Sequence, residues 1–78
     1  MTLAELKPGQ WARIQGINTN NPGIVRLMVL GLIEGVTVRF ENAAIGGDPL
    51  EISLFGTSIS IRKQQAQDFL IEPVTMGG

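Results

Sequence analysis

Carboxylates are the main candidates for chemistry in this sequence, which has 78 residues and neither histidine nor cysteine. Without histidine the usual general base is missing, and no serine has a histidine to activate it. Without cysteine there is no thiolate nucleophile. Soft and borderline metals prefer histidine and cysteine ligands, so only a hard cation held by oxygen atoms fits this composition. The sequence therefore indicates a protein that is not an enzyme.

Acidic side chains are the remaining oxygen ligands for such a cation. The ones that come into question are Glu34, Glu41, Asp48, Glu51 and Glu72. Asp48 and Glu51 lie three positions apart across a turn, and this spacing could hold a divalent cation weakly. The alternative is that both are ordinary solvent-facing charges, as most acidic residues are. We expect no cofactor and no tightly bound metal, with Asp48 and Glu51 as weak candidates.

The charge balance limits the kinds of partner that the chain can have. Its 6 basic and 7 acidic residues are spread singly, whereas nucleic-acid binding and membrane-surface anchoring need clustered lysine and arginine. The longest apolar run, residues 27–33, is far shorter than the roughly 20 residues of a membrane span. No basic segment followed by a long apolar core, as in a signal peptide, opens the chain. We expect a cytoplasmic protein that binds no nucleic acid and does not insert into the membrane.

A short helix that ends at a glycine is expected to position the rest of the chain. Residues 26–30 lack helix breakers and predict one or two helical turns, which could begin near Pro22. Gly31 occupies the position where a helix ends in a left-handed residue, and Leu32 would fold back onto the helix. Gly35 predicts a second turn before the next strand.

Apolar residues alternate with polar ones in five segments that turn-forming residues separate. The expected strands are residues 10–17, 36–44, 50–55, 58–62 and 69–74, with Gly56-Thr57 as a two-residue hairpin turn between the third and the fourth. Residues 63–68 predict a helical turn with Ala66 facing inward, and residues 2–6 predict either a capped helical turn or a frayed N-terminus. This order predicts a mainly β protein, a small SH3-like β-barrel with one short helix after the first strand.

The domain organisation follows from the length. A chain of 78 residues is one domain, and it buries only about 60% of the surface that the unfolded chain exposes. We expect a core from about residue 6 to residue 74 and a loose tail at residues 75–78. No internal repeat or low-complexity segment is visible.

Several motifs of the chain resemble the FeoA family, small accessory proteins of bacterial ferrous iron uptake, over about residues 6–74. The most specific parts are the helix end Arg26-x3-Leu30-Gly31-Leu32 with Gly35, the turn Gly47-Asp48-Pro49-Leu50, and Ser60-Ile61-Arg62-Lys63 before Ala66. Leu30, Gly31, Gly35, Asp48 and Pro49 are therefore expected to be structural residues. Glu34 departs from the family pattern, which usually has proline there, so that turn is expected to be less rigid.

The resemblance implies an SH3-like barrel without enzymatic activity. It also implies a partner, the large ferrous iron permease, a membrane protein with a cytosolic G-protein domain. The chain would regulate this permease by a protein–protein interaction, and we expect it to be a monomer or to self-associate weakly. The alternative is a regulatory module that binds a transition metal directly, like the similar barrel at the C-terminus of metal-dependent repressors. The absence of histidine and cysteine favours the first hypothesis.

The surface that would contact the permease is expected at the helix end. Candidate partner-binding residues are Arg26, Val29, Leu32, Ile33 and Glu34. Leu27 and Leu30 lie three apart and are expected to share the buried face of the helix, which leaves Val29 and Ile33 nearer the outside. Exposed apolar residues often mark an interface. The alternative is that Val29 and Ile33 pack under the loop of residues 18–23; Trp11 and Phe55 are the next candidates for docking.

Overall fold

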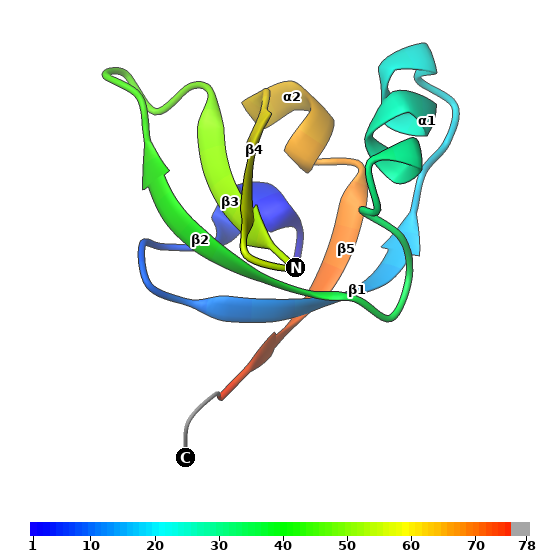
Figure 1. The fold of residues 1–78 in the computed structure, drawn as a ribbon. Helices are drawn as coiled ribbons and strands as arrows, with labels where there is room; N and C mark the ends of the chain where they lie inside the picture. Colours follow the sequence, from blue (N-terminus) through cyan, green and yellow to red (C-terminus); the bar gives the residue numbers. More distant parts are fainter. Residues whose placement is uncertain (76–78) are drawn as a thin grey trace.

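The computed structural model describes residues 1–75 and shows a mainly β protein (Figure 1). In chain order its elements are a 3₁₀ turn Leu3–Glu5, β1 Trp11–Ile17, α1 Pro22–Val29, β2 Thr37–Ala43, β3 Leu50–Leu54, β4 Thr57–Ile61, α2 Lys63–Ala66 and β5 Phe69–Val74. The predicted order of five strands, with a helix after the first and a helical turn before the last, is confirmed. Most of the expected tail, residues 76–78, lies outside the described residues.

All five strands belong to one antiparallel sheet with the order β4-β3-β2-β1-β5. The register shifts between Ile14 and Gly16, where β1 meets β5, and between Phe40 and Asn42, where β2 meets β3. Such bulges bend a strand and increase its twist. The sheet therefore curls around one core, as the curved strands in Figure 1 show, and leaves β4 and β5 as its two edges.

The core is built from one face of every strand together with the helices. Buried apolar side chains alternate along the strands, as expected for a sheet with one face covered. Within residues 1–75 no polar or charged residue belongs to the buried set. The buried residues are Leu3, Leu6, Ala12, Ile14, Ile24, Leu27, Leu32, Val38, Phe40, Leu50, Ile52, Leu54, Ile59, Ile61, Ala66, Phe69 and Ile71. Burial of Ala66 agrees with its predicted inward orientation.

The helix end has the predicted glycine stop. Leu30 caps α1, and Gly31 has a φ of +112°, in the region that only glycine adopts readily. The Gly31 amide donates to the Met28 carbonyl oxygen at 2.9 Å, and the Leu32 amide donates to that of Leu27 at 3.2 Å. These two bonds are those of a Schellman motif, in which the residue after the glycine folds back onto the helix.

A second glycine ties the segment after the helix to β1. Gly35 has a φ of +91°, and its amide donates to the Ile14 carbonyl oxygen at 2.8 Å. The Ile14 amide in turn donates to the Val36 carbonyl oxygen at 2.9 Å. The chain between α1 and β2 is therefore held at both ends by backbone hydrogen bonds.

The predicted buried face of the helix is wrong at one position. Ile24 and Leu27 are the buried residues of α1, whereas the side chain of Leu30 is 58% exposed. At 3.6 residues per turn, each step of three residues rotates by about 60° around the axis, so Leu30 lies about 120° away from Ile24. With Ile24 and Leu27 on the barrel, Leu30 turns outward.

The predicted turn between β3 and β4 is wrong by one residue. Leu54 pairs with Thr57, so the two turn residues are Phe55 and Gly56, with φ of +52° and +78°. Positive φ at both central positions is characteristic of a type I′ turn, whose twist matches that of the strands. Glycine is favoured at the second of these positions. β3 thus ends at Leu54, one residue earlier than expected, and Phe55 lies at the tip of the hairpin.

Candidate functional site

Three apolar side chains next to the helix end face solvent, and we call Val29, Leu30 and Ile33 the apolar elbow. Their exposed fractions are 81%, 58% and 45%. The loop of residues 18–23 does not cover them, so the alternative in which Val29 and Ile33 pack under it is wrong. That loop instead bonds to the chain beyond α2: the Asn21 side-chain amide donates to a carboxylate oxygen of Asp68 at 2.6 Å.

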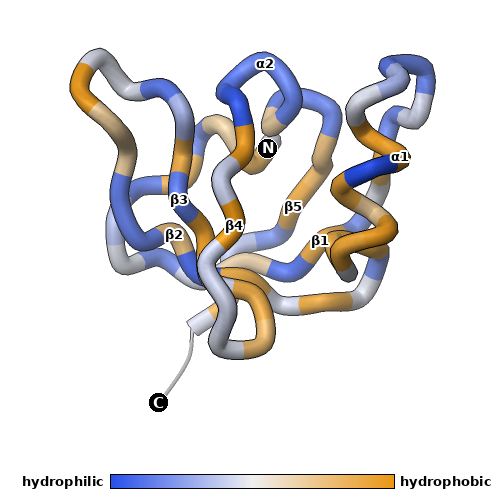
Figure 2. Tube along the Cα trace, turned by 45° about the horizontal axis from the view of Figure 1, so that its top comes forward, coloured by the Kyte–Doolittle hydropathy of each residue, from blue (hydrophilic) through white to orange (hydrophobic). Residues whose placement is uncertain are grey.

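The hairpin turn lies against the end of α1 at Gly31. A Cβ atom placed on Gly31 would lie 3.3 Å from Leu54 Cδ2 and 3.7 Å from Phe55 Cε2. Phe55 itself is 78% exposed. Figure 2 shows the apolar colour of α1 running on into the segment that follows it. Two segments far apart in the sequence therefore combine their exposed apolar side chains on one surface.

A groove runs between Leu30 of the apolar elbow and the edge strand β4. It has a volume of about 390 Å³ and is open to solvent. Its lining consists of Leu30, Leu54, Phe55, Thr57, Ser58, Ile59 and Ser60. The volume falls in the range of small ligand pockets, and an apolar lining with a few polar groups is typical of binding sites. The groove could accept one large apolar side chain.

The other predicted partner-binding residues, Arg26, Leu32 and Glu34, differ in their exposure to solvent. Arg26 on α1 and Glu34 in the turn before Gly35 are both exposed, so they can flank a partner at the elbow. Leu32 is completely buried, and its prediction as a contact residue is wrong. It is the residue of the Schellman motif that folds back, and the hydrogen bond of its amide to Leu27 directs its side chain into the core.

The weak metal candidates bond to separate donors. An Asp48 carboxylate oxygen accepts a hydrogen bond from the Lys63 amide at 2.9 Å, which satisfies the first turn of α2. A Glu51 oxygen accepts a hydrogen bond from the Ser60 hydroxyl. Asp48 precedes Pro49 through a cis peptide bond. Within residues 1–75 no group of three or more acidic, histidine or cysteine residues comes together.

Sequence reasoning missed three features of this surface. It placed Leu30 inward, it placed Phe55 in a strand, and it did not identify Ser58 and Ser60 as groove residues. A signal for Phe55 was present: an X-Gly pair between two alternating runs predicts glycine at the second turn position, which makes the preceding residue the first. No local signal indicated that β4 would be the last strand of the sheet, because strand order depends on long-range pairing.

Comparison with known proteins agrees with this architecture. The FeoA domain family matches residues 1–73. The solution structure of FeoA from Chlorobium tepidum is 29% identical with a TM-score of 0.88, over 96% of this chain and 71% of that one. The FeoA-like protein from Clostridium acetobutylicum is 28% identical with a TM-score of 0.88, over 100% of this chain and 91% of that one.

A third similar structure carries the name of the fold. FeoA from Stenotrophomonas maltophilia, crystallised with zinc and described as a prokaryotic SH3-domain protein, is 29% identical with a TM-score of 0.76, over 92% of this chain and 89% of that one. The predicted SH3-like fold is thereby confirmed. No curated protein sequence matches the chain, and no helix of residues 1–75 has the length and hydropathy to cross a membrane. With a family match over nearly its whole length, the chain belongs to the FeoA family.

Proposed function

We propose that this protein is a cytoplasmic accessory protein of ferrous iron uptake, which binds the ferrous iron permease through the apolar elbow and Phe55. Membership of the FeoA family supports the role in iron uptake. The observation that carries the binding surface is the exposure of Leu30 and Phe55, which line one groove, together with that of Val29 next to Leu30 in the chain. Large contiguous apolar patches on a small protein usually mark an interaction site.

The backbone hydrogen bonds on either side of this surface support a docking role. The hydrogen bonds of Leu32 to α1 and of Gly35 to β1 hold the elbow at both ends, so little conformational freedom is lost on binding. Arg26 and Glu34 are exposed and close in the chain to Val29 and Ile33, so they would supply a polar border. An apolar centre with a polar rim is the usual anatomy of a protein interface.

The proposed role is regulatory rather than catalytic. The chain has neither histidine nor cysteine, so it lacks the common bases and nucleophiles of enzymes. Binding to the cytosolic part of the permease would instead change its transport rate or its GTP turnover, by favouring one of the conformations of the permease.

Direct metal binding is the second candidate function, because the FeoA of S. maltophilia is seen in complex with zinc. In this chain the available ligands are carboxylates, and those of Asp48 and Glu51 already accept hydrogen bonds from Lys63 and Ser60. We therefore expect calorimetric titration with ferrous or zinc ions to show no site tighter than about micromolar. A tighter site would favour the metal-responsive module, with Asp48→Asn and Glu51→Gln as the first variants to measure.

The binding surface is tested by charge substitutions at the elbow. Val29→Asp and Ile33→Asp should abolish binding to the detergent-solubilised permease of the same organism, because a charge in an interface centre is desolvated without a partner. Both side chains are exposed, so the melting temperature should change little. Leu70→Asp is the matched control, since Leu70 on β5 is 53% exposed and lies outside the patch. Full binding by both folded elbow variants would contradict the proposal.

A further inference from the structure

The edge strand β4 has backbone groups that point away from the sheet. In an antiparallel hairpin with a two-residue turn, the residues flanking the turn form a hydrogen-bonded pair, and bonded and non-bonded pairs then alternate. Because Leu54 pairs with Thr57, the residues of β4 that bond to β3 are Thr57, Ile59 and Ile61. Ser58 and Ser60 therefore direct their amides and carbonyl oxygens outward.

These outward groups have no other backbone partner in the described part of the chain. Across residues 1–75, no backbone hydrogen bond from outside the β3–β4 pair reaches Ser58 or Ser60. Proteins usually protect an edge strand with proline, lysine or a covering segment, because an open edge pairs with other chains. The stretch Thr57–Ile61 contains neither proline nor lysine.

The groove lies directly beside this open edge. Ser58, Ile59 and Ser60 of β4 form one side, and Leu30 and Phe55 contribute apolar surface. A strand added to β4 would point every second side chain toward the core side of the sheet, where Ile59 already points. Phe55 helps to form the groove although its φ of +52° is unfavourable for a bulky residue, and such strain often accompanies function.

The opposite face of the same edge is acidic. The hydroxyls of Ser58 and Ser60 donate to carboxylate oxygens of Glu41 and Glu51. Glu41 also lies 3.9 Å from Arg39, whereas no ion pair to Glu51 occurs among residues 1–75. Side chains of an added strand that point to this face would meet negative charge.

We infer that β4 accepts an extended segment of a partner protein as an antiparallel strand, in which apolar residues alternate with lysine or arginine. Its basic residues would lie opposite Ser58 and Ser60, beside Glu41 and Glu51, and exchange backbone hydrogen bonds with the serines. Its apolar residue opposite Ile59 would fill the groove. Backbone pairing supplies affinity in such complexes, and the alternating side chains supply specificity. The identification of this partner as the permease rests on the proposed function.

A second copy of the chain fits this edge poorly. In the antiparallel pairing that uses both serines, Ser58 of one copy faces Ser60 of the other. The acidic faces of both sheets would then lie side by side, and like charges across an interface are unfavourable. A partner strand with basic residues avoids this repulsion.

The inference is tested with a synthetic peptide of about seven residues that alternates lysine and valine, with blocked ends. We expect nuclear magnetic resonance to show that the peptide slows exchange of the Ser58 and Ser60 amide protons by more than about tenfold, because these amides gain hydrogen bonds. Methylating the central lysine amides, which should face β4, is expected to abolish binding. Methylating the valine amides, which should face away, is expected to leave it unchanged.

Several outcomes would overturn the inference. Equal binding of the two methylated peptides would exclude backbone pairing, and unchanged exchange of both serine amides at millimolar peptide would exclude β4 as the site. Protection of these amides without peptide, together with dimers in sedimentation, would assign the edge to a second copy.

A pair of variants separates this inference from the proposed function. Ser60→Pro removes the outward amide without removing a bond to β3, whereas Ser60→Ala keeps the amide and removes only the hydroxyl. Peptide and permease should both lose at least about tenfold in affinity with Ser60→Pro and change little with Ser60→Ala. Permease binding that is unaffected in a folded Ser60→Pro protein would overturn strand addition and leave the proposed function intact. If the protein binds the peptide but not the permease, strand addition at β4 stands and the proposed function is wrong.

Discussion

β5 and β4 are the two edge strands of the same sheet, but only β5 has its outer backbone groups covered. The Ile71 amide donates to the Met1 carbonyl oxygen at 2.9 Å, Thr2 forms a bridge to Leu70, and Pro73 has no amide hydrogen to offer. On β4 the outward groups of Ser58 and Ser60 have no such cover within residues 1–75. A protein that protects one edge and leaves the other open can pair with a partner at a single place.

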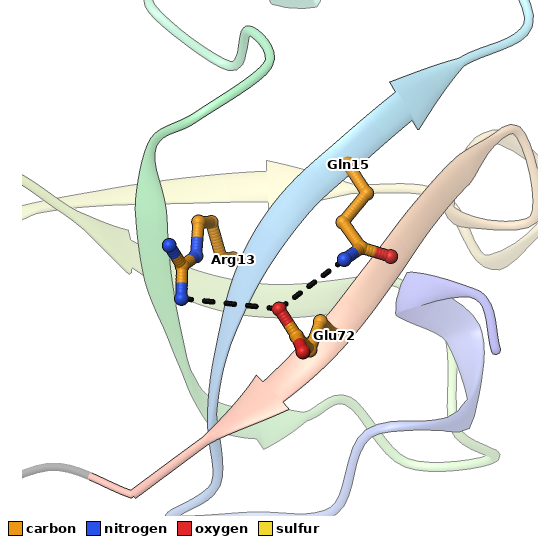
Figure 3. Close-up of polar contacts among 3 residues, drawn as sticks. All are labelled: Arg13, Gln15 and Glu72. Atoms are coloured by element: carbon orange, nitrogen blue, oxygen red, sulfur yellow. Dashed lines mark hydrogen bonds and ion pairs between the residues drawn. The ribbon is translucent and has the colours of Figure 1, made fainter.

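The charged side chains on the outer face of the sheet also differ between the two edges. Near β5, Arg13 lies 3.8 Å from Glu72, which stands opposite it in the register, and the Gln15 side-chain amide donates to the same carboxylate oxygen at 3.2 Å (Figure 3). Near β4, the carboxylate of Glu51 is bonded by a serine hydroxyl rather than by a cation. The edge of β5 is balanced in charge within the chain, whereas the edge of β4 can gain a cation from outside.

The largest expected difference is in stability, between an alanine substitution next to the β3–β4 hairpin and one beside β5. Gly31→Ala places a Cβ atom 3.3 Å from Leu54 Cδ2 at a φ of +112°, so both backbone strain and crowding should lower the free energy of unfolding, by about 2 kcal/mol. Gly16→Ala, beside β5, places a Cβ atom 3.5 Å from Leu70 Cδ1, an ordinary contact, and should change stability by less than about 0.5 kcal/mol. Urea unfolding of both variants measures the difference.

Equal stability of these two variants would contradict the expected difference between the two regions. It would mean that the contact between the helix end and the hairpin turn is loose, and that the groove beside β4 has no fixed shape.

The strain at the hairpin tip predicts a smaller effect of opposite sign. Asparagine tolerates the left-handed conformation better than a bulky residue does, so Phe55→Asn should stabilise the fold by about 1 kcal/mol. The same variant should weaken permease binding, because it removes an exposed aromatic side chain of the groove. Thermal melting and affinity, measured on one preparation, should move in opposite directions. A destabilised variant would show that Phe55 packs in the fold rather than serving a partner.

The smallest effect is expected at the ion pair on the closed edge. The side chains of Arg13 and Glu72 are 52% and 53% exposed, so solvent screens their attraction. Glu72→Gln should lower the free energy of unfolding by less than about 0.5 kcal/mol, and salt should reduce the effect further. A loss well above this value, in denaturant unfolding at low salt, would show that the side chains rather than the backbone cover protect β5.

Much of the fold could be predicted from local patterns. The alternation of apolar residues predicts all five strands, and the predicted bounds of the last strand are those observed for β5, Phe69–Val74. Gly31 and Gly35 were recognised as turn residues because their positions in the apolar pattern require positive φ, which both have. These features depend on a few neighbouring residues, so a single sequence contains enough information to find them.

The docking surface could be predicted only in part, because it depends on how distant segments pack. The sequence places Val29 and Ile33 nearer the outside but leaves open that they pack under the loop of residues 18–23. The choice of Ile24 and Leu27 as the buried pair of α1 is made by the barrel. That choice turned Leu30 outward and left Leu32 as the residue that enters the core. The contact of Gly31 with Phe55, 24 positions later in the chain, has no local signature at all.

The central claim, that the partner docks at the edge of β4 and not at that of β5, is tested most directly by site-specific photo-crosslinking. A photoreactive phenylalanine analogue replaces Phe55 in one protein and Leu70 in another; these side chains are 78% and 53% exposed, so both can reach a partner in contact with them. Each protein is produced in cells that contain the permease. We predict a covalent adduct with the permease from position 55 and none from position 70. An adduct from position 70 alone would contradict the account.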